Sequence, residues 1–166
     1  IADRAQITDV LYLYCRGVDR HDATALEHVY WPDSFDDHIA TKVSGPEFAK
    51  EVLVTTADMR TLHHLTNILI EFVSPNTARA ESYLIAQHEM LDESGALVYL
   101  EFGGRYIDLF EKRREEWRIR ERRLVFDFQQ TLPAGCWTEG WLAQLNRRGA
   151  RYPDDLLYQV AQPTSD

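Results

Sequence analysis

The amino-acid sequence predicts an α+β fold in which N-terminal helices pack on a strongly curved, mostly antiparallel sheet and enclose a small, mostly apolar pocket. Two observations lead to this prediction. Apolar residues recur at helical spacing near the start of the chain, and long strand-like runs follow one another from Leu62 onward, separated by short turn signals. Helices followed by such a meander are the α+β pattern, and long strands coil, which creates a concave face for helices to cover.

The N-terminal part of the chain is predicted to be mainly helical. Asp22 is a typical N-cap for a second helix, which Pro32 would end, and Pro46 stands in the first turn of a third helix, where proline is tolerated. In chain order, the predicted elements are a helix Asp3–Gly17, a helix Ala23–Tyr30, a strand Phe35–Val43 and a helix from Gly45 to about Leu53.

The predicted sheet is built from four long strands. Turn signals such as Ser74-Pro75-Asn76 and Asp92-Glu93-Ser94-Gly95 separate them, and short turns between consecutive strands make an antiparallel meander. The strands are predicted at Leu62–Phe72, Thr77–Leu91, Leu97–Lys112 and Trp117–Phe128.

We expect one domain over residues 1–130 and a C-terminal extension over residues 131–166. The extension is too apolar for a free tail, and we interpret it as a short helix and an extended arm packed on the domain or on a neighbouring subunit. The apolar residues that indicate this are Trp137, Trp141, Leu142, Leu145, Leu156, Leu157 and Tyr158. Association into a homodimer or homotrimer is the corresponding expectation.

Composition argues against several partners. The 166 residues carry 27 acidic and 18 basic side chains, a formal net charge of −9, which would repel nucleic acid and acidic membrane surfaces. No apolar run is long enough to cross a bilayer and no signal peptide is recognisable, so the cytoplasm is the expected compartment. Cys15 and Cys136 lie far apart and have no metal-ligand spacing, and we expect neither a metal nor a cofactor.

Strand alternation sorts the histidines. His63 and His64 are adjacent in a predicted strand and therefore point to opposite faces, which disfavours a metal site that uses both. Ile68 and Ile70 would share the face of His64. In the next strand, His88 shares a face with small residues, namely Ala78, Ala80, Ser82 and Ala86 together with Leu84, and these suit a concave interior with space for a ligand.

Asp19 and His63 are candidates for a catalytic pair, because the end of a helix and the start of a strand can meet at the rim of the pocket. A carboxylate that accepts from one ring nitrogen fixes the tautomer and raises the basicity of the other, which makes a general base. The plainer interpretations are that Asp19 only caps the second helix, as Asp22 does, and that His63 is a structural histidine.

The run from Ile7 to Phe128 resembles the SnoaL-like branch of the nuclear-transport-factor-2-like superfamily. The matching pieces, in order, are Gly17-Val18-Asp19-Arg20-His21-Asp22, Trp31-Pro32-Asp33, Leu62-His63-His64-Leu65-Thr66-Asn67, Gly104-Arg105-Tyr106-Ile107-Asp108, Glu111, Trp117-Arg118-Ile119, Arg122 and Asp127. No piece is diagnostic alone, and their order and spacing carry the resemblance. It implies a cone-shaped fold, also called cystatin-like. It also implies kinship with scytalone dehydratase, hexachlorocyclohexane dehydrochlorinase, bile-acid 7α-dehydratase and non-enzymatic members.

The resemblance implies roles for four residues. The Asp–His pair of the dehydratase and dehydrochlorinase members matches Asp19 and His63, a catalytic tyrosine matches Tyr14, and a second pocket histidine matches His88. Gln87 stands where the bile-acid enzyme has an aspartate, and Val18 stands where scytalone dehydratase has a tyrosine that contacts the substrate, so the chain copies neither enzyme.

The predicted function is that of a cofactor-independent lyase or isomerase acting on a small apolar ring compound by His–Asp general base catalysis. Tyr14 or His88 would donate a proton or hydrogen bond, and the residues expected around the ligand are Val18, Leu65, Leu84, Val125 and, given a bulge at Arg122-Arg123, Arg122. Without such a bulge, we expect Arg122 and Asp108, together with Arg105 and Glu111, to form exposed cross-strand ion pairs. His21 and His38 are expected to be exposed loop residues.

Three alternatives remain at this point. One is a non-catalytic protein that binds a small molecule, and another is the small subunit of an aromatic-ring-hydroxylating dioxygenase, since the superfamily contains both. In either, side chains would fill the pocket or His63 would lack a carboxylate partner. A weaker alternative is an epoxide hydrolase, whose Asp–Arg–Asp set we cannot place in this sequence.

Overall fold

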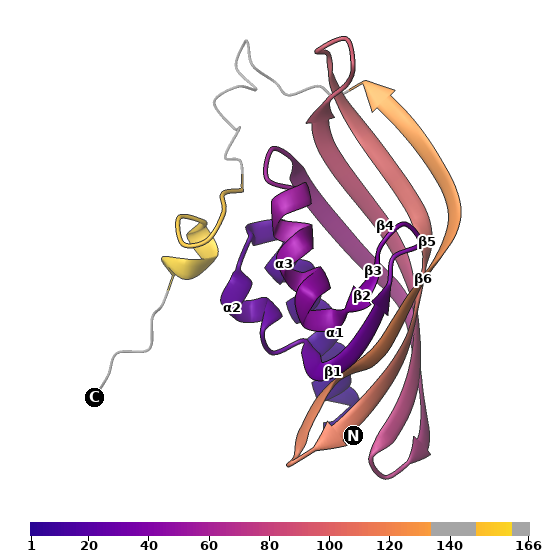
Figure 1. Cartoon of the computed structure of the whole chain (residues 1–166). Helices are drawn as coiled ribbons and strands as arrows, with labels where there is room; N and C mark the ends of the chain where they lie inside the picture. Colours follow the sequence, from indigo (N-terminus) through magenta and orange to yellow (C-terminus); the bar gives the residue numbers. More distant parts are fainter. Residues whose placement is uncertain (134–148, 161–166) are drawn as a thin grey trace.

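The structure is a computed structural model that describes residues 1–133 and 149–160. Helices α1 (Ala2–Arg20), α2 (Ala23–Leu26) and α3 (Gly45–Thr55) pack on one side of a strongly curved sheet, as Figure 1 shows. Their positions follow from local signals, since the Asp22 side chain accepts a hydrogen bond of 3.0 Å from the Ala25 amide and Ser44 caps α3 in the same way. The predicted α+β fold is confirmed.

Six strands form one mixed, mostly antiparallel sheet. They are β1 (Tyr30–Asp37), β2 (Lys42–Ser44), β3 (Arg60–Ser74), β4 (Thr77–Leu91), β5 (Leu97–Arg113) and β6 (Glu116–Pro133). Their order across the sheet is β2-β1-β6-β5-β4-β3, and only β1 and β6 run parallel. The meander from β3 to β6 is therefore as predicted, while β1 joins it at the far end from β3.

Two predictions for the N-terminal half are wrong. The second helix ends at Leu26 and not at Tyr30, because Tyr30 begins β1 and pairs with Ile119 of β6. The predicted single strand Phe35–Val43 is a hairpin of β1 and β2. Pro32 lies at the register shift between Tyr30 and Phe35, where proline interrupts no regular ladder.

The core lies between α1 and the concave face of the sheet. Ile7, Leu11 and Val18 of α1 are buried against the small side chains of β4, such as Ala78 and Ala80. The side chains of β4 alternate as predicted, with the face of His88 turned inward. In β3, however, Asn67 has a left-handed backbone (φ 49°) at a bulge, so Ile68 and Ile70 turn to the inner face and not to the face of His64.

The described part of the C-terminal extension packs near the ends of the helices. Its short 3₁₀ turn η2 (Leu156–Tyr158) places the Tyr158 hydroxyl 2.9 Å from Asp22 Oδ2, to which it donates, and Arg20 lies 3.5 Å from Asp155. Trp137, Trp141, Leu142 and Leu145, on which the prediction of a helix in the extension depended, lie outside the described residues. Over residues 1–133 and 149–160, the chain contains no helix of sufficient length and hydropathy to cross a membrane.

Candidate active site

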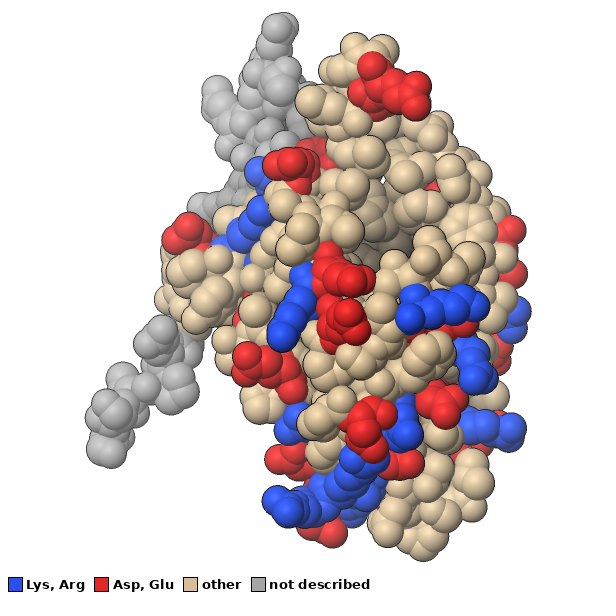
Figure 2. All heavy atoms as spheres, in the orientation of Figure 1, with Lys and Arg blue, Asp and Glu red and all other residues tan. Residues whose placement is uncertain are grey.

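A cavity of about 440 Å³ lies between the helices and the concave face of the sheet. Figure 2 shows a hollow bordered mainly by uncharged residues, with acidic and basic side chains spread over the surrounding surface. Its walls are largely aromatic and aliphatic, and its polar side chains include Tyr14, His38, His63 and His88. A mostly apolar cavity with a few convergent polar groups is the usual form of a small-molecule site.

His63 lines this cavity, and Asp19 contacts it from behind the cavity wall. The last turn of α1 carries Asp19 and the start of β3 carries His63, and the imidazole Nδ1 lies 2.6 Å from Asp19 Oδ1. The same carboxylate accepts from the Thr61 hydroxyl at 2.8 Å and from the backbone amide of His63 at 2.9 Å. Because a carboxylate only accepts, Nδ1 carries the ring proton, and Nε2 of a neutral His63 is left as an acceptor.

Asp19 stays ionised despite its position. Burial raises the pKa of its carboxyl group, but the hydrogen bonds and charge of His63 and the Thr61 hydroxyl outweigh this and leave the pKa below its usual value. The side chains of Asp19 and His63 are only 8% and 6% exposed. A buried, charged carboxylate is therefore available to stabilise His63 when its ring gains a proton.

His88 and Tyr14 flank this pair. The ring centres of His88 and His63 are 5.8 Å apart and those of Tyr14 and His63 are 6.3 Å apart. Burial, followed by the neighbouring His63, lowers the pKa of His88 to about 4, so its ring is neutral at neutral pH. Burial raises the pKa of Tyr14, so its phenol keeps its proton and can donate a hydrogen bond.

His38 is not an exposed loop residue, contrary to prediction. It lies in the turn between β1 and β2, lines the cavity, and stacks on Phe48 of α3 with ring centres 4.0 Å apart. Its Nδ1 contacts Asp36 Oδ1, and its Nε2 lies 3.5 Å from the Tyr14 hydroxyl. The sequence contained one signal for this pair, since residues two apart in a strand share a face. The hairpin that folds His38 inward did not follow from the single strand predicted here. His21, predicted to be exposed, is half-buried and contacts Thr56.

Arg122 and Asp108 form a buried ion pair, which also differs from the expected exposed one. Two hydrogen bonds of 2.8 Å join the guanidinium to the carboxylate, and both side chains are fully buried. The register between β5 and β6 shifts between Leu109 and Phe110, which leaves Arg120 as an extra residue in β6. This bulge lies two residues before Arg122 and turns the Arg122 side chain to the concave face. The bulge was considered at Arg122-Arg123 and lies instead at Arg120.

Of the other residues predicted to contact the ligand, some line the cavity and some do not. Val18 and Leu84 line the cavity, whereas Leu65 packs against the core and Val125 is replaced in the wall by its neighbours, Leu124 and Phe126. Arg122 lies behind the wall, with its guanidinium carbon 4.3 Å and 4.0 Å from the ring centres of Tyr14 and Tyr106. Arg105 of β5 pairs with Glu81 of β4, a cross-strand pair as expected. Glu111 pairs most closely with Arg113 of its own strand, at 2.6 Å, and with Arg120 of β6 at 4.0 Å.

Two adjacent glycines, Gly103 and Gly104, stand opposite the register shift that brings Gln129 of β6 into the cavity wall beyond Phe126. A register shift between Gly103 and Gly104 changes the alternation of β6 relative to β5. A Cβ atom at Gly103 would overlap the Phe128 ring, and one at Gly104 would meet the Val125 carbonyl oxygen. Only glycine allows β5 and β6 to approach this closely, and both glycines line the cavity.

Metal ligation finds no support in the part of the chain that the structure describes. Residues 1–133 and 149–160 contain no group of three or more His, Cys, Asp or Glu side chains that could hold a metal ion. Cys15 is buried, and Cys136 lies outside the described residues.

Comparison with known proteins agrees with the resemblance read from the sequence. The model of a family described as SnoaL-like domain matches residues 1–123. No curated protein matches the sequence. Because the family match spans most of the chain, it covers α1 to β5, the first part of β6 and both members of the Asp19–His63 pair.

Several solved structures share the fold. Hexachlorocyclohexane dehydrochlorinase LinA-type3 from Novosphingobium barchaimii is 22% identical, with a TM-score of 0.71 over 81% of this chain and 92% of the other. A "putative scytalone dehydratase" from Novosphingobium aromaticivorans is 22% identical, with a TM-score of 0.69 over 81% and 95%. A "putative aromatic ring hydroxylase" from the same organism is 23% identical, with a TM-score of 0.68 over 78% and 93%. At these identities the likeness shows the fold alone.

Proposed function

This chain belongs to the SnoaL-like domain family, and we propose that it is a cofactor-independent lyase or isomerase, of the dehydratase type, that acts on a small apolar ring compound. The family and its dehydrochlorinase and dehydratase neighbours support a lyase-like role in general. The observation that carries the specific proposal is the 2.6 Å contact between Asp19 and His63, a histidine that lines a mostly apolar cavity.

In the proposed reaction, His63 is the general base. Its Nε2 removes a proton from a carbon next to a carbonyl or to a leaving group, while Nδ1–H donates to Asp19. The imidazolium that forms is stabilised by a carboxylate that is already ionised and held by Thr61. Because the carboxylate is already in place, such a pair needs no reorganisation during proton transfer. Preorganised charges of this kind are the main source of electrostatic catalysis.

Tyr14 is the proposed hydrogen-bond donor to the oxygen that gains charge on the substrate. Its ring packs against His63 and its phenol keeps its proton. His88 is neutral at neutral pH, so we assign it a contact with the ligand and not the role of a cationic acid. Val18, Leu84 and Phe126 in the walls would fix an apolar ring and keep water from the reacting atoms.

The proposed ligand follows from the size and chemistry of the cavity. A volume of about 440 Å³ with apolar walls suits one or two fused rings, and no nucleotide or membrane partner is part of the proposal. Two alternatives are a non-catalytic binding protein and a dioxygenase subunit, and the solved structure named as an aromatic ring hydroxylase bears on the second. Neither requires a buried carboxylate on His63, and co-purification with a larger iron-containing subunit would support the second.

Site-directed variants test the proposal directly. Ring compounds with a hydroxyl or halide two carbons from a carbonyl are screened for elimination. In the variants His63→Gln and Asp19→Asn we expect kcat to fall by about 100-fold or more, with unchanged far-ultraviolet circular dichroism. His28→Gln, an exposed histidine outside the cavity, is the matched control and should keep full activity. Full activity in Asp19→Asn would exclude the His–Asp mechanism.

A further inference from the structure

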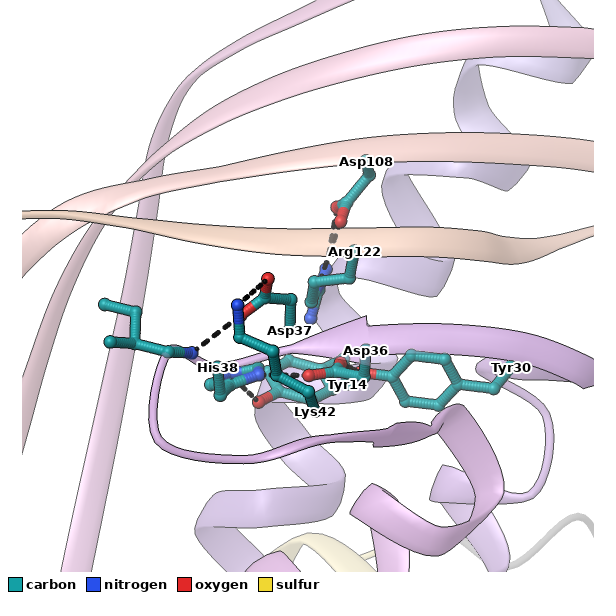
Figure 3. A network of polar contacts seen from close by, with 9 residues as sticks. Tyr14, Tyr30, Asp36, Asp37, His38, Lys42, Asp108 and Arg122 are labelled. Carbon is teal, nitrogen blue, oxygen red and sulfur yellow. Dashed lines mark hydrogen bonds and ion pairs between the residues drawn. The ribbon is translucent and has the colours of Figure 1, made fainter.

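A second histidine–carboxylate pair faces the same cavity from the opposite side of Tyr14. Asp36, near the end of β1, is fully buried and accepts hydrogen bonds from the Tyr30 hydroxyl at 2.6 Å and from Nδ1 of His38. Figure 3 shows His38, Asp36, Tyr14 and Tyr30 side by side. This pair shares no residue with Asp19 and His63, so two independent histidine–carboxylate pairs each place their histidine in the cavity lining.

The charges around Asp36 bear on whether the His38 ring is protonated. Arg122 lies over this group, but its charge is already matched by Asp108, which it binds through two hydrogen bonds. The remaining polar neighbours are Tyr30, Tyr14 and Tyr106, all phenols whose pKa burial raises, so they stay neutral.

His38 is thus the one described neighbour that can balance the Asp36 carboxylate. The nearby Lys42 belongs to the exposed pair with Asp37 and lies outside the buried group. A buried carboxylate without a counter-charge is costly, and a protonated His38 makes the group of Arg122, Asp108, Asp36 and His38 electrically neutral.

We infer that His38 is a second catalytic residue of this cavity, held as an imidazolium by Asp36, and that its Nε2–H protonates the leaving group while His63 takes the carbon proton. This inference rests on the proposed function. His38 lines the cavity, and the 3.5 Å between its Nε2 and the Tyr14 hydroxyl is long for a hydrogen bond, so the Nε2 proton is available to a ligand. Stacking on Phe48 fixes the ring plane.

The proton balance of an elimination fits this arrangement. The C–H bond breaks and its proton goes to His63, its electron pair forms the new double bond, and the C–O bond breaks with its pair on oxygen. The departing oxygen accepts the proton of His38 and leaves as water. His63 then holds one extra proton and His38 lacks one, and exchange with solvent after product release restores both. A halide leaves without a proton, so its elimination needs His63 but not the acid.

The protonation state is measured without any substrate. Long-range proton–nitrogen correlation spectra of the nitrogen-labelled protein at neutral pH distinguish imidazolium from neutral rings, and the His38→Gln and His63→Gln variants assign the signals. We expect His38 to be an imidazolium and His63 to be neutral with its proton on Nδ1. A neutral His38 at neutral pH overturns the inference, whatever the protein catalyses.

The catalytic role is measured by the dependence on the leaving group. The probes are 3-hydroxy-1-tetralone and 3-chloro-1-tetralone, which both yield 1-naphthol. In His38→Gln we expect kcat to fall about 100-fold for the hydroxy compound and less than about threefold for the chloro compound. Equal effects on both probes overturn the acid role.

The same two probes separate this inference from the proposed function. His63→Gln should lose both reactions, and retained turnover in that variant overturns the proposed function and, with it, the catalytic role of His38. His28→Gln, at an exposed position outside the cavity, should leave both rates unchanged, and a loss there comparable to that of His38→Gln overturns the assignment to His38.

Discussion

Three buried carboxylates on the concave side of the sheet are each held by more than one donor. Asp19 accepts from His63 and Thr61, Asp36 accepts from Tyr30 and His38, and Asp108 accepts twice from Arg122. Burying a charge is costly unless it is paired and hydrogen-bonded. These contacts therefore fix the orientation of the rings that we propose for acid and base.

The depressed pKa of His88 predicts a pH-dependent stability. Its pKa falls from 6.5 to about 4 on folding, so between these values the unfolded chain binds a proton that the folded chain does not. Stability should therefore fall as pH drops through this window and level off below it, by about 3 kcal/mol at most. Urea unfolding at a series of pH values measures the free energy of unfolding.

The control for this prediction is His88→Gln, which removes the titrating group. Its free energy of unfolding should depend less steeply on pH between about 6.5 and 4. Asp19 contributes stability that is lost only as pH falls through its own lowered pKa, below its usual value of 3.8, and so outside this window. Parallel curves for the two proteins would contradict the prediction.

At the scale of elements, bulges decide which side chains face the cavity. The register shift at Arg120 turns Arg122, Leu124 and Phe126 inward, and the one at Gly103 and Gly104 brings Gln129 into the wall. The hairpin of β1 and β2 places His38 there as well. Each irregularity lies in or beside a strand that lines the site, where bulges commonly re-aim side chains.

The buried pair between β5 and β6 predicts a large effect of breaking it. Arg122→Met leaves Asp108 buried without its partner and should lower the free energy of unfolding by about 3–5 kcal/mol. The double variant Arg122→Met/Asp108→Leu should recover most of this loss, because both charges are then absent. Urea unfolding of the three proteins gives these values.

A matched control for this pair lies at the surface. Arg79 and Glu71 are joined at 3.1 Å across β3 and β4, and both side chains are more than half exposed. Arg79→Met should therefore cost less than about 1 kcal/mol. A loss in Arg122→Met no larger than that in Arg79→Met would show that the buried charge is relieved in another way.

At the scale of the whole molecule, β3 is the long edge of the sheet and leaves apolar side chains exposed. Leu69 and Val73 are 57% and 63% exposed, and Phe72 lies between them. Exposed apolar edges of this length are commonly covered by another chain. We propose that the protein associates into a homodimer or homotrimer through this edge.

Sedimentation analysis tests this association. The wild-type protein should sediment as a dimer or trimer at micromolar concentration, and Leu69→Glu/Val73→Glu should shift it toward the monomer, because charges would be buried in the interface. Val54→Glu, at an exposed position near the end of α3, should leave the mass unchanged. A monomeric wild-type protein would contradict the proposal.

The sequence by itself determined the order of elements and the face of most strand residues. The periods of two and 3.6 residues, the Asp22 cap and the turn signals act locally, so the four long strands and the burial of His88 followed from them. The opposite orientation of His63 and His64 and the approach of Asp19 to His63 could also be expected from the places of these residues in their elements.

The tertiary structure alone decided which other groups share the cavity. A bulge reverses the alternation of every residue beyond it, and its position depends on how two strands align, which no local pattern records. For this reason Arg122 was expected at the surface and Val125 at the ligand. The Asp36–His38 pair was not predicted, because it depends on the pairing of β1 with β6 and on the hairpin of β1 and β2. The places of Asp19 and His63 at a helix end and a strand start made one histidine–carboxylate pair a candidate from the sequence. Long-range pairing of the strands placed the second pair beside the same cavity.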